Sequence, residues 1–396
     1  MIIKPRTRGF ICTTSHPVGC EAQVQEQIDY VLQQPGIEGP RNVLVIGAST
    51  GYGLSARIAA AFGSRANTVG VYRPSQATEK RTASAGWYNS VAFEKAAEAA
   101  GLKSFSVTGD AFTQETKAKT VELIRKELGQ VDLVVYSVAS ARRTLPETGE
   151  TVSSVLKPIG PAYTNKTVNF HTGEVTEVTI EPATEEEVKN TVEVMGGDDW
   201  ELWMNELAEG GVLAPDVTTI AFSYIGSEIT KAIYRDGSIG QAKDHLEATA
   251  LKLNEKLAAG GGRAYVTVSK ALVTQSSSAI PVVPLYVSAL YKVMKEKGLH
   301  EGCIEQIYRL FSDRLYKGQE TPVDEKGRIR IDDWELREDV QAEVAELWSK
   351  VTSENIEELT DLAGYRREFF QLFGFETDGV DYDADVNPVV DNPKAI

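Results

Sequence analysis

Cysteine is scarce in this chain, and long apolar runs are absent. Three cysteines in 396 residues cannot form a disulfide framework, which indicates a reducing compartment. No run of residues approaches the roughly 18 apolar positions of a membrane span, and residues 1–8 contain no sustained apolar core of the kind that a signal peptide needs. We therefore expect a cytoplasmic protein with no membrane partner.

Positive charge is also in short supply. The chain has 57 Asp and Glu residues against 41 Lys and Arg residues, a formal net charge of −16. Because nucleic acid binding requires positive surface against the phosphates, no nucleic-acid partner is expected. Cys12, His16 and Cys20 follow one another at four-residue steps but lack a fourth ligand, so no metal site is predicted.

The strongest local signal is a glycine-rich turn between a strand and a helix. Residues 43–46 form a short apolar run of the kind buried in a parallel sheet, and Gly47-Ala-Ser-Thr-Gly51-Tyr-Gly53 follows at once. Leu54 and Ile58 begin the apolar face of a helix. This order of elements is the context of a dinucleotide fingerprint, in which amides at a helix N-terminus bind pyrophosphate. A simple tight turn would use the same glycines.

Further strands are expected at 67–72, 104–108 and 131–139, separated by helical stretches near 87–100 and 113–128. The alternation predicts an α/β fold: a Rossmann-like doubly wound parallel sheet with additional helices and a β-hairpin insertion. Ligands collect at the carboxyl ends of such strands, which makes Asp110-Ala111 and Val138-Ala139 candidate cofactor contacts.

A tyrosine and a lysine nine positions apart, Tyr234 and Lys243, are the candidate catalytic pair. Nine residues in one continuous helix would place them on opposite sides. We expect Asp236-Gly237 to break the chain and Ser238 to open a new helix, with a capping box to Gln241. A charged lysine held near a tyrosine would lower the pKa of the tyrosine hydroxyl and make it a better proton donor. A boundary tyrosine beside a solvated lysine would have the same spacing.

Motifs spread over nearly the whole chain resemble the trans-2-enoyl-CoA reductase family, which includes the large single-chain type of bacterial enoyl-acyl-carrier-protein reductase. The spacing of nine positions between Tyr234 and Lys243 differs from that of ordinary short-chain dehydrogenases, in which the tyrosine and the lysine are four positions apart. Besides Tyr234 and Lys243, the matching segments are GASTGYG (47–53), AGWYNSVAF (85–93), GDAF (109–112), YSVAS (136–140), MGGDDW (195–200), SYIG (223–226), HEGCIEQIYRL (300–310) and RIRIDDWELREDV (328–340).

The resemblance implies NADH- or NADPH-dependent reduction of the 2,3 double bond of trans-2-enoyl thioesters in fatty acid synthesis. The implied partners are enoyl-CoA or enoyl-acyl carrier protein, and the chain is expected to act as a monomer. Matched residue by residue, Tyr234 is the catalytic tyrosine, Lys243 the cofactor-binding lysine and Tyr224 the substrate-contacting tyrosine. The implied dinucleotide contacts are Gly47, Ala48, Ser49, Thr50, Gly51, Tyr52, Asp110, Ala111, Val138, Ala139, Leu272, Val273 and Thr274.

The chain departs from the family after the second strand. NADH-using members usually carry an acidic residue there, which binds the adenosine ribose 2′-hydroxyl, but this chain has Arg73 followed by Pro74 on the acidic position. An arginine at such a position accommodates a 2′-phosphate. We therefore include Arg73 and Pro74 among the cofactor contacts and expect the protein to accept NADPH.

Two other functions stay open on the sequence: a carbonyl reductase or epimerase of the short-chain class, and a dinucleotide-binding protein without activity. The chain is expected to form one integrated unit. Its predicted parts are an N-terminal segment (1–41), the dinucleotide-binding core (42–143), an insertion with a hairpin (144–200), a catalytic segment (201–284), a helical part (285–375) and a poorly packed tail (376–396).

Overall fold

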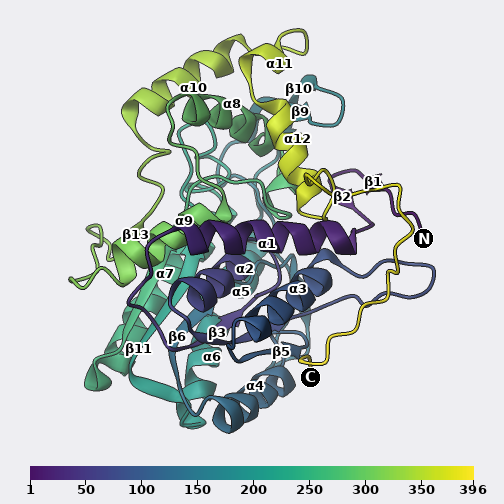
Figure 1. The fold of residues 1–396 in the computed structure, drawn as a ribbon. Coiled ribbons are helices and arrows are strands. Elements are labelled where there is room, and N and C mark those ends of the chain that lie inside the picture. Colours follow the sequence, from purple (N-terminus) through teal and green to yellow (C-terminus); the bar gives the residue numbers. More distant parts are fainter.

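A seven-stranded parallel sheet forms the centre of the computed structural model, which describes residues 1–396 (Figure 1). The spatial order of its strands is β13-β12-β11-β6-β3-β4-β5. The strands are β3 (Asn42–Ile46), β4 (Asn67–Tyr72), β5 (Ser104–Thr108), β6 (Val131–Tyr136), β11 (Leu213–Ser223), β12 (Arg263–Val268) and β13 (Ile329–Arg330). The predicted doubly wound α/β sheet is confirmed.

Helices cover both faces of the sheet because its central strands are apolar on both sides. Val43 and Val45 of β3 face one core, and Leu44 and Ile46 face the other. The first core is closed by α1 (Pro17–Gln33), α2 (Gly51–Ile58), α3 (Ala85–Ala99) and α9 (Cys303–Leu310), and the second by α4 (Gln114–Glu127), α6 (Asp198–Glu209) and α7 (Ser238–Leu257).

The predicted hairpin of the insertion is present. β9 (Tyr163–Asn169) pairs antiparallel with β10 (Glu174–Ile180), and the turn between them contains Gly173 at a φ of 80°. Around it lie β7 (Arg142–Thr144), β8 (Thr151–Ser153) and α5 (Glu185–Met195). The insertion is therefore a set of short antiparallel pairs followed by a helix that packs on α7.

The C-terminal helices stand apart from the sheet, beside the hairpin, in the upper part of Figure 1. They are α8 (Val283–Glu296), α10 (Glu338–Lys350), α11 (Ile356–Leu359) and α12 (Leu362–Gln371). Both α10 and α12 pack against α8, and Tyr365 and Phe369 of α12 are fully buried. The remaining short elements are β1 (Thr7–Arg8), β2 (Ile11–Cys12), π-helical turns at Ala59–Gly63 and Phe311–Leu315, and 3-10 turns at Ala258–Gly260 and Ser277–Ala279. None of the helices has the length and apolar character needed to cross a bilayer.

The tail, predicted to be poorly packed, has few buried residues but is anchored at specific points. Residues 376–396 run back across the molecule and end beside β5 (Figure 1). The backbone of Ser106 exchanges hydrogen bonds with Lys394 and Ile396, at 3.0 and 2.9 Å. The indole of Trp87 donates to the Val390 carbonyl at 2.8 Å. The tail is held because β5 is an edge strand, whose free backbone groups bind another extended segment.

Candidate active site

The predicted site residues follow the carboxyl ends of parallel strands, so they lie along one edge of the sheet. Gly47 follows β3, Asp110 comes two residues after β5, and Val138 comes two residues after β6. Tyr224 follows β11 directly, and Leu272 lies in the loop after β12. The sheet thus brings together segments that are far apart in the chain.

The glycine turn packs directly against the neighbouring strand end. Gly47 has a φ of 85°, and a Cβ placed on it would lie 2.0 Å from the Ser137 carbonyl oxygen. A Cβ on Gly53 would lie 1.9 Å from the carbonyl oxygen of Gly47. Thr50 precedes α2 without capping it through its side chain, so this side chain leaves the first amides of the helix free. This arrangement fits the pyrophosphate of a dinucleotide.

The loop after β5 is fixed by buried polar groups that the sequence did not reveal. The Ala111 carbonyl accepts hydrogen bonds from the ammonium of Lys117 at 3.0 Å and from the indole of Trp203 at 3.1 Å. Lys117 is also paired with Asp199 at 2.7 Å, and both side chains are almost fully buried. The only sequence signal for this support was the resemblance of MGGDDW, which contains Asp199. The position of the loop with Asp110 and Ala111 is therefore fixed by Lys117 and Trp203, which bind the Ala111 carbonyl.

Arg73 and Asp110 lie next to each other at this edge. The guanidinium of Arg73 is 3.1 Å from the Asp110 carboxylate, and the arginine side chain is 77% exposed. Pro74 follows and is half-buried. Arg73 thus lies beside Asp110, a predicted cofactor contact, whose carboxylate balances the charge of the arginine.

Tyr224 and Tyr234 meet edge to face. Their ring centroids are 4.7 Å apart and the ring planes are inclined by 86°. Tyr234 is buried within consecutive turns that precede α7. The predicted catalytic and substrate-contacting tyrosines therefore lie together at the carboxyl edge of the sheet.

Lys243 lies in the second turn of α7, as predicted. Its ammonium donates a hydrogen bond to the carbonyl oxygen of Phe222 on β11, at 3.1 Å. The ring of Phe222 is stacked on Tyr52 of the glycine turn, with centroids 5.2 Å apart. Burial lowers the pKa of Lys243 to about 8. The lysine is thereby held close to the predicted cofactor turn.

The expected polarisation of Tyr234 by Lys243 is absent from this arrangement. No hydrogen bond joins the two residues, and the ammonium donates instead to the Phe222 carbonyl. The pKa of Tyr234 is raised, first by burial and then by the nearby Glu335 and Tyr365. The prediction of a lowered tyrosine pKa is therefore wrong for this structure, and Tyr234 is a neutral phenol.

The start of α7 is predicted correctly, but its capping box is not. The helix begins at Ser238 after Gly237, with no side-chain cap. The Ser238 hydroxyl donates to the Val155 carbonyl at 2.6 Å. It therefore links α7 to the insertion and does not cap the helix. The competing partner comes from a segment 83 residues away, which local sequence cannot indicate.

The loop after β12 carries the last of the predicted contacts. Leu272 and Val273 are buried, and the Val273 amide donates to the Tyr291 hydroxyl at 3.1 Å. Ser277 accepts from the Thr274 amide at 2.9 Å and donates to the Leu272 carbonyl at 2.7 Å. This small serine and threonine network shapes the loop into a compact turn.

Glu335 is a buried carboxyl group that sequence reasoning missed. It lies within the segment RIRIDDWELREDV, at 0% exposure. The hydroxyl of Tyr224 donates to its Oε1 at 3.0 Å, and that of Tyr286 donates to the same oxygen at 2.7 Å. The amide of Ala271 donates to Oε2 at 2.6 Å. Tyr224 is thus tied to a carboxyl group supplied by the C-terminal part of the chain.

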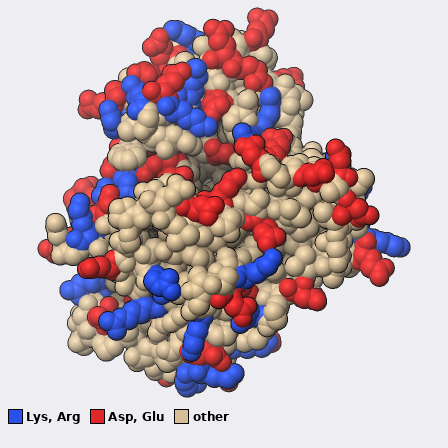
Figure 2. All heavy atoms as spheres, viewed as in Figure 1, with Lys and Arg blue, Asp and Glu red and all other residues tan.

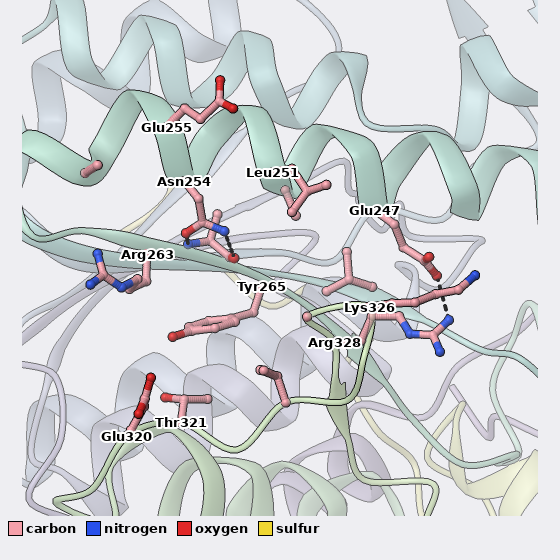
Figure 3. Close-up of a pocket in the computed structure, with 16 residues that line it drawn as sticks. Glu247, Leu251, Asn254, Glu255, Arg263, Tyr265, Glu320, Thr321, Lys326 and Arg328 are labelled. Atoms are coloured by element: carbon pink, nitrogen blue, oxygen red, sulfur yellow. Dashed lines mark hydrogen bonds and ion pairs between the residues drawn. The ribbon is translucent and has the colours of Figure 1, made fainter.

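A cavity of about 480 Å³ lies elsewhere, between α7, the first residues of β12 and the segment around residues 320–328 (Figure 3). Glu247 and Arg328 form an ion pair of 3.0 Å at one end of it. It contains none of the predicted site residues and lies along the amino half of β12. No group of three or more His, Cys, Asp or Glu side chains is arranged to hold a metal ion.

Three family models match the chain. Residues 2–79 match the NAD(P)H binding domain of trans-2-enoyl-CoA reductase, and residues 81–316 match the trans-2-enoyl-CoA reductase catalytic region. Residues 323–386 match a model described as an enoyl reductase FAD binding domain. The last region folds as β13 and three helices whose apolar faces are buried, and it has no glycine-rich turn between a strand and a helix. It does not fit a second dinucleotide, and we derive no step through a flavin.

Whole-chain relatives agree with these models. The chain is 62% identical to the enoyl-[acyl-carrier-protein] reductase [NADH] of Flavobacterium johnsoniae, with 98% of each sequence covered. It is 58% identical to the trans-2-enoyl-CoA reductase [NADH] of Ruminiclostridium cellulolyticum, again over 98% of each. The crystal structure of Treponema denticola trans-2-enoyl-CoA reductase in complex with NAD superposes with a TM-score of 0.94, at 51% identity and 98% coverage of both chains. This chain therefore belongs to the trans-2-enoyl-CoA reductase family of oxidoreductases.

Proposed function

We propose that the protein uses NADH to reduce the 2,3 double bond of trans-2-enoyl thioesters, with Tyr234 as proton donor, Lys243 as cofactor-binding residue and Tyr224 as substrate contact. The observation that carries the proposal is the meeting of Tyr224 and Tyr234 at the sheet edge where the glycine turn lies. Two phenol hydroxyls in one place can both donate hydrogen bonds to the carbonyl oxygen of a bound thioester. The names of the relatives, which specify NADH, support the choice of cofactor.

The chemistry follows from the charge that forms on the substrate. The bound nicotinamide supplies a hydride to C3 of the enoyl group. Electron density then moves onto the thioester oxygen, and the resulting enolate needs hydrogen-bond donors already in place. Tyr234 is neutral in its buried setting, so it can donate to that oxygen and supply the proton that completes the saturated product. General-acid assistance of this kind is worth roughly 10²–10⁴-fold in rate.

Lys243 has a separate task in this proposal. Its ammonium is bound to a backbone carbonyl and to no carboxylate. Such a group can exchange its weak neutral partner for the ribose hydroxyls of the nicotinamide half of the cofactor. The stacked pair of Tyr52 and Phe222 connects the glycine turn to β11, the strand to which the lysine is bound.

The adenosine end would be bound by the glycine turn, by Asp110 and Ala111, and by Arg73 and Pro74. We propose that NADH is the principal cofactor and that Arg73 allows NADPH to be used as well. Asp110 balances the charge of Arg73 in the present structure, at 3.1 Å. The 2′-phosphate of NADPH would have to replace this carboxylate as the partner of Arg73. The affinity for NADPH is therefore lower than an unpaired arginine would give.

The carrier of the acyl group is either coenzyme A or acyl carrier protein. Figure 2 shows acidic and basic side chains mixed on the upper helical part of the viewed face, and acidic side chains beside the hollow beneath it. Two arginine pairs, at 142–143 and 366–367, are candidate contacts for an acidic carrier. Arg143 is buried, however, and Arg366 and Arg367 are paired with Glu357 and Asp378. Of these four arginines only Arg142 is exposed and outside an ion pair, so they offer little basic surface to an acidic protein carrier.

The direct test is the loss of NADH absorbance in the presence of crotonyl-CoA, compared with the carrier-linked crotonyl thioester and with NADPH. We expect thioester-dependent oxidation of NADH, faster with the CoA substrate. A simple ketone serves as the control substrate. Turnover of the ketone alone would identify a carbonyl reductase, and cofactor binding without any turnover would identify a dinucleotide-binding protein.

A further inference from the structure

Glu335 is buried with no cation in direct contact with its carboxyl group. It forms no ion pair, and the nearby ammonium of Lys270 is bound to the carbonyl oxygens of Ala271 and Glu301 at 3.1 Å each. The three hydrogen bonds to its carboxyl group come from two phenols and one amide. A carboxyl group in this setting is more costly to ionise than one in water, because burial disfavours the charged form.

The two phenols on Glu335 are not equivalent. Tyr286 accepts a hydrogen bond from the side-chain amide of Gln341 at 3.2 Å, which leaves its own O–H to donate to Glu335. The same amide is anchored on the backbone carbonyl of Glu335 at 2.7 Å. Tyr224 has no such second donor and instead packs against Tyr234. Only the bond between Tyr224 and Glu335 is therefore free to reverse its direction.

We propose that Glu335 is a positioning residue whose protonation sets the direction of its hydrogen bond with Tyr224, so that the neutral acid turns Tyr224 into a donor for the thioester oxygen. When Glu335 is ionised, the single O–H of Tyr224 is used up by the carboxylate, and Tyr224 offers the substrate only lone pairs. When Glu335 carries a proton on Oε1, that proton is donated to Tyr224, and the phenol O–H is released. This role rests on the function proposed above.

The surroundings of Glu335 favour the neutral acid. Burial raises its pKa, against the lowering by the hydrogen bonds from Tyr286 and Ala271 and by the ammonium of Lys270. Asp332, on the same segment, raises it further. The ionisable groups that face it from the neighbouring elements are Tyr224 after β11, Tyr234 before α7, Tyr52 in the glycine turn, Tyr286 on α8 and Lys270 after β12.

The inference is tested with four variants: E335Q, E335A, Y224F and the double variant E335A/Y224F. The side-chain amide of E335Q can donate to Tyr224 as the neutral acid does, but its nitrogen cannot accept the hydrogen bond from Tyr286. Its kcat/KM for crotonyl-CoA should therefore stay within about fivefold of wild type. E335A and Y224F should each lose about 100- to 1000-fold, the scale of one oxyanion donor. The double variant should lose no more than either single variant, because both remove the same interaction. Additive losses would overturn the proposal.

Two further readouts separate this role from a merely structural one. The kcat/KM of wild type should fall as pH rises through the raised pKa of Glu335, and E335Q should lack that step. The infrared spectrum of wild type should show a protonated carboxyl band that is absent from E335Q and disappears at higher pH. A band missing at every pH at which the protein is folded would overturn the proposal.

The infrared measurement needs no turnover. Failure of the proposed function, seen as no oxidation of NADH by wild type, is thus distinguishable from failure of the Glu335 assignment. Tyr286→Phe is the matched control, since it removes the other phenol from the same oxygen. Tyr286→Phe should reduce kcat/KM by less than Y224F does. An equal or larger loss would contradict the assignment of Tyr224 as the donor that Glu335 controls.

Discussion

The ring of Tyr224 stands edge to face on the ring of Tyr234, with centroids 4.7 Å apart. The first ring follows β11 and the second lies in the turns before α7, so the contact depends on the sheet and the helix being assembled. Such contacts stabilise aromatic pairs by about 0.5–1.5 kcal/mol beyond their burial. Here the contact also holds two phenols at one site.

Replacing Tyr234 by phenylalanine removes the proposed proton donor and keeps the ring contact with Tyr224. We expect kcat to fall by at least about 100-fold, while the Kd for NADH, measured by fluorescence, stays within about twofold because no cofactor contact is assigned to the hydroxyl. Tyr265→Phe is the control, because Tyr265 lines the cavity of Figure 3 and not the carboxyl edge of the sheet. It should leave kcat and the Kd for NADH unchanged. Near-normal turnover of Tyr234→Phe would assign the proton to another group.

The buried ammonium of Lys243 should make cofactor binding pH-dependent. Its pKa is lowered to about 8, so the charged form that binds ribose hydroxyls most strongly is lost as pH rises above that value. The Kd for NADH should therefore increase between about pH 7 and 9. In Lys243→Met the binding should be weaker at neutral pH and nearly independent of pH. Lys252→Met, an exposed lysine on the same helix, is the control and should follow wild type.

The same lysine contributes to the pH dependence of stability. Its pKa is about 8 in the folded protein, against an ordinary value of 10.5 for a lysine in water, so the unfolded chain binds more protons between these values. The free energy of unfolding should therefore gain a positive slope with pH across this window from Lys243. Urea denaturation of wild type and Lys243→Met at both ends of the window would show it. A difference between the two proteins that does not change with pH would contradict the assignment.

The glycine turn offers a matched pair of substitutions. Gly47→Ala would place a Cβ 2.0 Å from the Ser137 carbonyl oxygen at a φ of 85°, whereas Gly51→Ala meets no atom within 4 Å at a φ of 53°. Gly51→Ala should cost about 1–2 kcal/mol of backbone strain alone. Gly47→Ala should cost a further 1–3 kcal/mol, roughly, for the clash. Equal costs in urea denaturation would show that the turn has room to move away from β6.

Arg73 is the residue to change in order to test cofactor choice. We expect Arg73→Ala to lower kcat/KM with NADPH by about tenfold, because it removes a charge for the 2′-phosphate. The value with NADH should change by less than about twofold, since Arg73 has 77% of its side chain exposed and is bound only to Asp110. If the ratio of the two efficiencies does not change, cofactor selection must reside in other residues.

Local patterns in the sequence were sufficient for the parts of the fold that depend on nearby residues. The apolar run before Gly47, a hairpin within the insertion and the helix start at Ser238 were all predicted. The roles proposed for Tyr234 and Lys243 came from the resemblance of the chain to a family, and the structure adds that the lysine is bound to the Phe222 carbonyl.

Long-range polar contacts could not be predicted. Glu335 meets Tyr224 across 111 positions, and no periodicity in either segment indicates that pairing. The burial of Tyr234 near Glu335, which reverses the expected pKa shift, depends on the same folding of the C-terminal part onto the sheet edge. The composition of the tail could not indicate its anchoring points, because they depend on the free edge of β5 and on the indole of Trp87.

The most direct test of the central claim follows the two hydrogens that are added to the substrate. Crotonyl-CoA would be reduced with deuterium on the transferable position of NADH in ordinary water, and separately with unlabelled NADH in heavy water. The account predicts deuterium at C3 of the product in the first reaction and at C2 in the second. Deuterium from the solvent at C3, or none from the cofactor at that carbon, would contradict it.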